Sequence, residues 1–257
     1  MGHQITILQS VLSTLLEGGR GVMGTAFPQQ PPLLLKLYDM EGCPFCRRVR
    51  EVLTLLNLDV EIYPCPKNGK RFRADAIALS GESQFPLLVD DNTGTVLLES
   101  QAIIDYLFAT YGKHGKTPAK WKNLSDTPIS GMLISAASSM RGLKAAAGND
   151  TRTAPAQKLA LWSFEASPYS RPVRERLCEL ELPYILHNVA KERWQDMGPA
   201  VLRAKPGPYV PLVGGKREQL LPVMQGKMQV PYLVDPNTGV SLFESKAILA
   251  YLNQTYA

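Results

Sequence analysis

The chain has 257 residues, of which 45% are hydrophobic and 20% are charged, with a formal net charge of +5. This composition is typical of a soluble globular protein, and no stretch reaches the roughly 18 to 20 apolar residues of a membrane-spanning helix. Lysine and arginine are scattered rather than clustered with aromatic residues, which argues against nucleic-acid binding. The four cysteines do not resemble a secreted disulfide framework, so we expect a reducing intracellular compartment.

The N-terminal residues 1–32 predict an extension that contains one short helix. Residues 5–16 form this helix, and Gly18-Gly19 ends it. We expect the helix to pack on the body of the protein.

Residues 33–113 predict a first domain with the element order β-α-β-α-β-β-α. The helix that begins at Pro44 has apolar residues at helical spacing, and Asp-Asn-Thr-Gly at 91–94 predicts a hairpin turn. The predicted elements are strand 33–38, helix 44–56, strand 59–63, helix 72–79, strands 86–89 and 96–98, and helix 100–110.

Residues 114–157 predict a linker, because they are rich in Lys, Ser, Ala and Gly. One apolar stretch, residues 129–137, predicts a short helix within it.

Residues 158–257 repeat the first domain. Cys-Pro-Phe-Cys at 43–46 aligns with Ser-Pro-Tyr-Ser at 167–170 at an offset of 124, whereas residues 84–112 align with 229–257 at an offset of 145. The second domain therefore contains 21 additional residues, which lie within 190–228. Their density of Pro and Gly predicts a loop, and loops of this length are often functional.

The Cys-x-x-Cys motif predicts thiol chemistry. Cys43 lies at the start of the helix that begins at Pro44, where unpaired backbone N–H groups and the helix dipole favour a thiolate. Cys46 lies one turn further on the same side, where it can attack a mixed disulfide formed at Cys43. A structural zinc half-site is the alternative, but zinc needs about four ligands and the sequence has no second close Cys/His pair, so no metal is predicted.

A Cys-x-x-Cys at the first strand-to-helix turn, with this element order, predicts two tandem thioredoxin-like domains. Both copies resemble the N-terminal domain of glutathione transferases. The first copy most resembles the Cys-Pro-Phe variants, namely the omega-class transferases and the type-two prostaglandin E synthase. The tandem arrangement, without the all-helical C-terminal domain, is similar to tandem proteins of plants, algae and cyanobacteria, which implies the chloroplast stroma or the cytoplasm.

The resemblance implies one glutathione site in each domain. Cys43 matches the reactive thiol, Pro86 the cis-proline, and Glu99-Ser100 the pair that holds the γ-glutamyl group, although the last two are also ordinary helix caps. The glutathione-binding candidates of the first domain are Phe85, Pro86, Glu99, Ser100, Lys67 and Arg71. Those of the second domain are Ser167, Val230, Pro231, Glu244 and Ser245. Seven Lys or Arg and three acidic residues between 42 and 73 suit the carboxylates of glutathione.

We expect different roles for the remaining two cysteines, Cys65 and Cys178. Cys65 follows the second strand and therefore lies on the Cys43 side of the sheet, which makes it a candidate third reactive thiol. Cys178 lies inside a helix, and we expect a buried structural thiol there.

Together these features predict a glutaredoxin-like, glutathione-dependent thiol-disulfide oxidoreductase. Cys43 would attack a disulfide or glutathionylated protein, and Cys46 or glutathione would resolve the product. The second domain either binds glutathione without exchange or is architectural. The alternatives are a non-enzymatic glutathione-binding or protein-interaction scaffold, an isomerase, and an iron-sulfur carrier; the sequence predicts no oligomeric state.

Overall fold

We analysed a computed structural model that describes residues 3–16, 19–122, 141–149, 152–200 and 202–257. The helix predicted at 129–137 lies outside these residues. Across the described ranges, no helix is long and apolar enough to span a membrane.

The first half has the predicted element order, and every boundary falls within two residues of its expected position. Pro44 occupies the first turn of α2, and Asn57, with φ 55°, ends that helix in the left-handed conformation. The elements are α1 (His3–Leu16), β1 (Leu35–Asp39), α2 (Pro44–Leu56), β2 (Val60–Pro64), α3 (Arg73–Ser80), β3 (Leu87–Asp90), β4 (Thr95–Leu98) and α4 (Ser100–Tyr111).

The second half repeats this architecture with one difference in the inserted loop. The Pro and Gly density of the insertion predicts no helix, yet it contains two short ones, because α7 and η3 close tight turns within the loop. The elements after α4 are η1 (Ala119–Trp121), β5 (Leu159–Ser163), α6 (Arg171–Glu179), β6 (Tyr184–Asn188), η3 (Trp194–Asp196), α7 (Lys216–Leu220), β7 (Tyr232–Asp235), β8 (Val240–Phe243) and α8 (Ser245–Tyr256).

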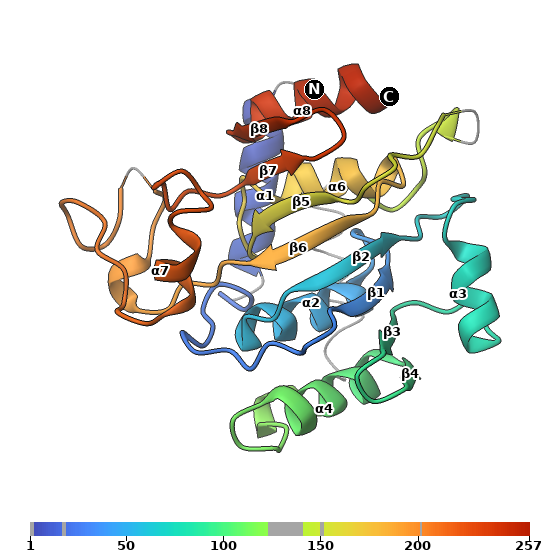
Figure 1. The fold of residues 1–257 in the computed structure, drawn as a ribbon, viewed down its shortest axis with the longest axis horizontal. Coiled ribbons are helices and arrows are strands. Elements are labelled where there is room, and N and C mark those ends of the chain that lie inside the picture. The colour runs from blue at the N-terminus through green and yellow to red at the C-terminus, as the bar shows by residue number, and fades with distance from the viewer. Residues whose placement is uncertain (1–2, 17–18, 123–140, 150–151, 201) are drawn as a thin grey trace.

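The two thioredoxin-like halves share one eight-stranded sheet. Its order is β4-β3-β1-β2-β6-β5-β7-β8, so the halves meet where β2 pairs with β6 in the antiparallel direction (Figure 1). The register pairs Val60 with Leu186 and Ile62 with Tyr184. Each half thus covers the exposed strand edge of the other, an edge that would otherwise invite association with another chain.

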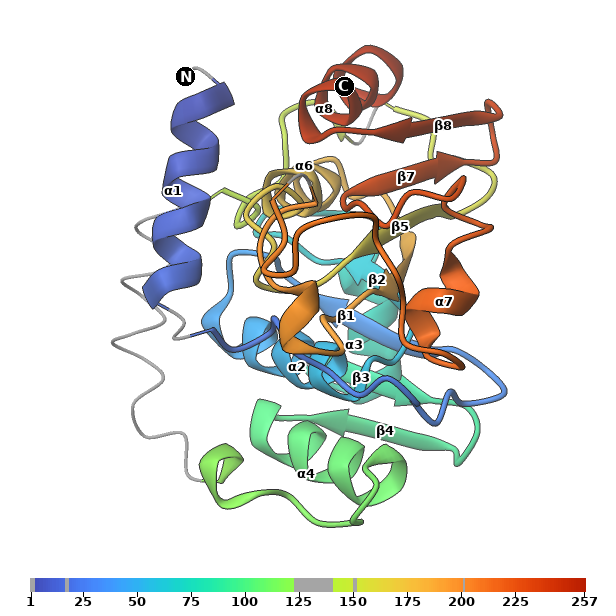
Figure 2. The same cartoon turned by 90° about the vertical axis from the view of Figure 1, so that its left-hand side faces the viewer.

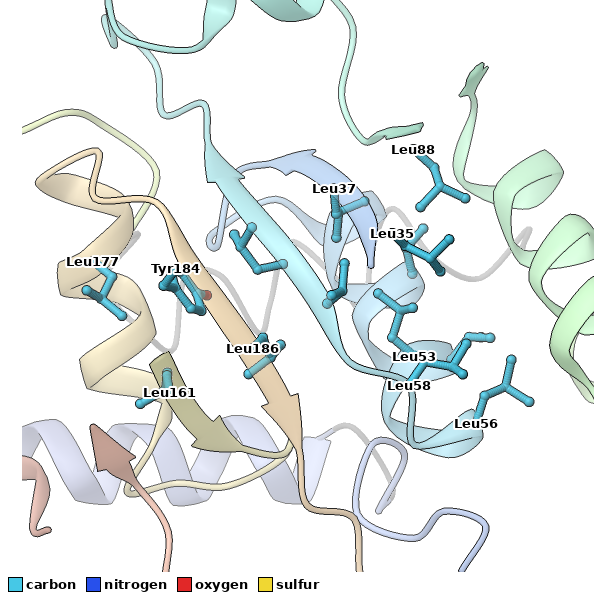
Figure 3. Packing of buried hydrophobic residues seen from close by; sticks show 14 of the residues in the cluster. Leu35, Leu37, Leu53, Leu56, Leu58, Leu88, Leu161, Leu177, Tyr184 and Leu186 are labelled. Atoms are coloured by element: carbon cyan, nitrogen blue, oxygen red, sulfur yellow. The ribbon is translucent and has the colours of Figure 1, made fainter. Parts of the chain in front are cut away.

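One apolar core runs beneath both halves. Helix α2 packs beside α4, and α6 packs beside α8. Leu35, Leu53 and Leu88 of the first half belong to the same buried cluster as Leu177 and Tyr184 of the second (Figure 3). The halves therefore bury apolar surface against each other as well as within themselves.

A buried cluster of charges lies where the halves meet. Arg50 and Arg174 occupy equivalent positions in the repeat, and each is 1% exposed. Arg50 Nε donates to Glu165 of the second half at 3.0 Å, and Arg174 Nε donates to Glu41 of the first half at 2.9 Å. Arg50 also bonds to Asp39. The two guanidinium groups therefore neutralise carboxylates across the boundary between the halves.

The carboxylates of this cluster differ in pKa. Burial disfavours ionisation of Glu165, but the guanidinium groups of Arg174 and Arg50 outweigh it and lower its pKa to about 2. Burial raises the pKa of Asp39 to about 6, although Arg50 opposes the shift.

The segments that precede each half cross to the opposite half. Gly24 and Val22, before β1, exchange backbone hydrogen bonds with Lys191, at 3.0 and 2.9 Å. Leu143 and Ala145, before β5, form the same pair of bonds with Lys67, which is the repeat equivalent of Lys191. Helix α1 continues the first of these segments and lies beside α6 of the second half (Figure 2).

Gly142 shows how closely these crossing segments dock. Its φ is +68°, and an added Cβ would lie 2.9 Å from the Cβ of Glu41 and 3.1 Å from the Cα of Glu175. We expect Gly142→Ala to lower the free energy of unfolding by about 2 to 4 kcal/mol, because it combines left-handed strain with overpacking. Urea unfolding at constant m-value measures this loss.

Gly94 provides the matched control, since it has the same φ of +68° with nothing within 4 Å of an added Cβ. Gly94→Ala is expected to cost only about 1 kcal/mol, the conformational part alone. Equal losses for the two variants would show that the crossing segment is not tightly docked.

Candidate active site

Cys43 and Cys46 lie at the start of α2. Cys43 is the N-cap residue and is 7% exposed, whereas Cys46 is fully buried. The side chain of Cys43 forms no capping hydrogen bond to α2, but the Cys46 thiol and the backbone N–H groups of Phe45 and Cys46 interact with its sulfur and lower its pKa. The Met40 N–H points at Cys46 Sγ, 3.5 Å away. The helix start thus presents donors to Cys43, as its position in the sequence predicts.

These contacts separate the pKa values of the two thiols. The hydrogen bond from Cys46 outweighs burial and, with the backbone N–H groups and Arg50, lowers the pKa of Cys43 to about 7. Burial, donation to Cys43 and the charge of Asp39 raise the pKa of Cys46 well above its ordinary value. At neutral pH the pair therefore combines a partly ionised Cys43 with a protonated Cys46, which suits a nucleophile and a resolving thiol.

The Phe85-Pro86 peptide bond is cis, as is Val230-Pro231 in the second half. Phe85 belongs to the same buried cluster as Cys43 and Cys46. Arg73, which the sequence reasoning did not single out, places its guanidinium 4.7 Å from the centre of the Phe85 ring. Arg73 is the first residue of α3, and its position carries no sequence signal of this contact, because the contact depends on tertiary packing.

Glu99 and Glu244 have an unusual backbone conformation. Their φ values are 69° and 68°, in the left-handed region that residues other than glycine rarely adopt. Within the described residues, neither side chain forms a capping bond to its helix. Gln84, a further residue that the sequence did not indicate, donates instead to Glu99 Oε1 at 2.5 Å. Such conformations are concentrated at functional sites, which favours a binding role over a plain helix cap.

Arg71 serves the contact between the halves. Its guanidinium donates to the backbone carbonyls of Leu180, Glu181, Asn149 and Arg152, at 2.9 to 3.2 Å. We therefore remove Arg71 from the glutathione-binding candidates. Lys67 keeps an exposed side chain.

The basic segment, residues 42–73, is also less exposed to solvent than its charged sequence predicts. Its three helix arginines, Arg47, Arg48 and Arg50, are buried. Arg48 lies over the Trp121 ring, with its guanidinium 5.9 Å from the ring centre, and Arg50 contacts Glu165 of the second half. Much of the expected positive surface therefore lies inside the protein.

The other two cysteines are buried and not ionised. Cys65 belongs to the same apolar cluster as Cys43 and Cys46, and burial raises its pKa. Cys178 Sγ donates to the carbonyl of Gly142 at 3.2 Å, and burial raises its pKa as well. In the described part of the chain, no group of three or more His, Cys, Asp or Glu side chains is arranged to hold a metal ion.

In the second half, only some of the predicted site residues line a cavity. Ser167 and Val230 line a cavity of about 340 Å³, whereas Pro231, Glu244 and Ser245 are not part of its lining. Ser167 Oγ accepts a hydrogen bond from Ser170 Oγ at 2.9 Å. Helix α1 and the insertion supply the opposite walls of the cavity. The sequence did not indicate this cavity, because its walls come from segments that are far apart along the chain.

Comparison with known proteins identifies the family. A model described as the glutathione S-transferase N-terminal domain matches residues 37–117 and 161–257. Among solved structures, a glutathione transferase from Bombyx mori is 30% identical over 33% of this chain and 39% of its own, with a TM-score of 0.29. The match thus spans less than half of that protein, and no curated protein matches. Because the family model covers more than half of the chain and both of its halves, the protein belongs to the glutathione S-transferase N-terminal-domain family.

Proposed function

We propose that the protein is a glutathione-dependent thiol-disulfide oxidoreductase whose reactive centre lies in the first half. The observation that carries this proposal is the position of Cys43 at the N-cap of α2, in one buried cluster with Cys46 and with Phe85 of the cis Phe85-Pro86 bond. The lowered pKa of Cys43 and the raised pKa of Cys46 agree with it. Disulfide exchange uses a thiolate as the nucleophile, and a second thiol close by can resolve the mixed disulfide, whereas a scaffold protein needs neither.

The reaction begins at Cys43. Its thiolate attacks one sulfur of a glutathione-protein disulfide, the S–S bond breaks, and the protein thiolate leaves and takes up a proton. Glutathione then remains attached to Cys43 as a mixed disulfide.

Cys46 or a second glutathione resolves this intermediate. Cys46, which is hydrogen-bonded to Cys43, loses its proton and attacks Cys43 Sγ, so that glutathione leaves and a Cys43-Cys46 disulfide forms. Two glutathione molecules return this disulfide to the dithiol and become oxidised glutathione. When glutathione attacks the intermediate directly, the same products form without Cys46.

Glutathione would be held by the groups around Cys43. The cis peptide at Phe85-Pro86 offers backbone groups to a peptide-like ligand, and Glu99-Ser100 would receive the α-amino and α-carboxyl ends of the γ-glutamyl group. Lys67 remains available for the glycyl carboxylate. We further propose disulfide-containing or glutathionylated proteins as substrates, in the chloroplast stroma or the cytoplasm.

Trapping the mixed disulfide tests the proposal. Cys46→Ala treated with oxidised glutathione is expected to accumulate one glutathionyl group on Cys43, because the resolving thiol is absent. The wild type is expected to accumulate the Cys43-Cys46 disulfide instead. Peptide mapping by mass spectrometry distinguishes the two products.

Cys65→Ala and Cys178→Ala serve as controls and are expected to behave as the wild type, since both thiols are buried and protonated. An adduct on Cys65, or no adduct on any cysteine of Cys46→Ala, would contradict the proposal and favour a scaffold.

A further inference from the structure

The cavity of the second half is enclosed by three segments. The turn between β5 and α6 contributes Ser167, helix α1 contributes Val11, and the insertion contributes Ala200 and Met228. Figure 2 shows α1 beside α6, with the insertion extending from β6 toward β7. Its volume of about 340 Å³ lies in the range of small-molecule sites, roughly 300 to 1,000 Å³. Most of its lining is apolar.

Two buried cations, Lys191 and Arg217, interrupt this apolar lining. They are 7% and 3% exposed. Lys191 Nζ donates to the Gly198 carbonyl at 2.8 Å, and Arg217 Nε donates to the Ala190 carbonyl at 2.9 Å. Within the described residues, neither cation has a carboxylate at ion-pair distance.

The two nearest acidic residues are engaged elsewhere. Asp196 accepts hydrogen bonds from the side chain and backbone of Arg193, at 3.2 and 3.0 Å. Glu192 accepts from the backbone N–H of Arg217 at 2.8 Å rather than from its guanidinium. Asp196 and Glu192 thus act on the two cations only from beyond ion-pair distance.

The surroundings of Lys191 change its pKa. Burial, together with the neighbouring Arg217 and Arg203, lowers the pKa of Lys191 to about 7. A buried cation without a partner is costly, and an anion that enters the cavity would relieve that cost.

We propose that this cavity binds a small molecule with an apolar body and one anionic group, such as a carboxylate, which Lys191 and Arg217 would hold. An anion placed between them would form charge-assisted hydrogen bonds, while the apolar walls would bury the rest of the molecule.

Glutathione does not fit this description. It carries an ammonium group that needs an acidic partner, and the described residues that line the cavity include no Asp or Glu. Lys67, the equivalent of Lys191 in the first half, is exposed. The insertion, which the sequence of the first half lacks, supplies Arg217 and Met228 to the lining of this pocket. The second half would therefore have a ligand site that differs in specificity from the glutathione site of the first half.

Two fluorescent probes with the same ring system test the anionic preference. 8-Anilinonaphthalene-1-sulfonate carries one anionic group, whereas N-phenyl-1-naphthylamine is neutral. The wild type is expected to bind the sulfonate at least about tenfold more tightly, as one charge-assisted hydrogen bond implies. Lys191→Met is expected to remove this preference and leave the affinity for the neutral probe within about twofold.

Three further variants distinguish a change at this cavity from a general change in the protein. Lys67→Met, at the equivalent position, is expected to leave both affinities unchanged, and Lys191→Arg is expected to keep the anionic preference because it keeps the charge. Ala200→Trp is expected to abolish binding of both probes by filling the cavity. Because the sulfonate also binds partly folded protein, decanoate and decanol are compared as competitors, and only decanoate is expected to displace it.

Equal affinity of the wild type for both probes would overturn the proposal. So would an unchanged sulfonate affinity in Lys191→Met or in Ala200→Trp, or equal displacement by decanoate and decanol. These outcomes do not depend on Cys43, since the measurements involve no thiol exchange.

Discussion

Cys43→Ser is expected to lower the rate of glutathione-dependent disulfide reduction by at least about 1,000-fold, a loss typical of removing a nucleophile. The physical reason is ionisation: the pKa of Cys43 is about 7, so a large fraction is thiolate at neutral pH, whereas a serine hydroxyl at the same helix start stays protonated. The assay follows reduction of the mixed disulfide between glutathione and 2-mercaptoethanol, with glutathione as the electron donor.

The pH dependence of thiol alkylation provides the control for this result. Alkylation of Cys43 by iodoacetamide is expected to rise with pH through a midpoint near 7, below the value of about 8.5 for free cysteine. Cys46→Ala removes the strongest hydrogen bond to Cys43 and is expected to move this midpoint upward, while Cys65→Ala is not. A midpoint near 8.5 in the wild type would contradict the proposed activation of Cys43.

Arg50→Met is expected to lower the free energy of unfolding by about 3 to 5 kcal/mol. The substitution leaves Asp39 and Glu165 buried, with one positive partner fewer, because Arg50 is 1% exposed and bonded to both. Arg174 still pairs with Glu165, at 3.1 Å, but Asp39 loses its bond to Arg50. Urea unfolding at pH 7 measures the loss.

Arg176→Met is the matched control, since Arg176 pairs with Glu179 at 3.1 Å and both side chains are partly exposed. Its loss is expected to stay within about 1 kcal/mol. If the two variants lost equal stability, the buried cluster would not hold the halves together.

The free energy of unfolding that Arg50→Met loses is expected to depend on pH in one direction. The pKa of Asp39 is raised from 3.8 to about 6 on folding, so its contribution to stability is greatest below pH 3.8 and is lost as pH rises through 6. Without Arg50 that pKa rises further. We therefore expect Arg50→Met to cost more at pH 7, where folded Asp39 must either ionise without Arg50 or hold a proton that the unfolded chain releases, than at pH 5, where it is mostly protonated in both folded proteins.

Local sequence signals determined much of the fold. Pro44 and the apolar spacing behind it placed α2 at its observed residues, and Asp-Asn-Thr-Gly placed the hairpin of β3 and β4. The repeat predicted two thioredoxin-like halves, and the Cys43-Cys46 spacing predicted a shared helix turn. These features depend on hydrogen bonds and side-chain spacing within a few residues, which a sequence displays directly.

Only the tertiary structure decided how the halves meet. The pairing of β2 with β6, the burial of Arg50 against Glu165, and the crossing of the segments before β1 and β5 all join residues more than 70 positions apart. A buried arginine and an exposed one look alike in a sequence, because burial depends on what the other half covers. The cavity at Lys191 follows the same rule: its walls come from α1, the turn between β5 and α6, and the insertion, which folding alone brings together.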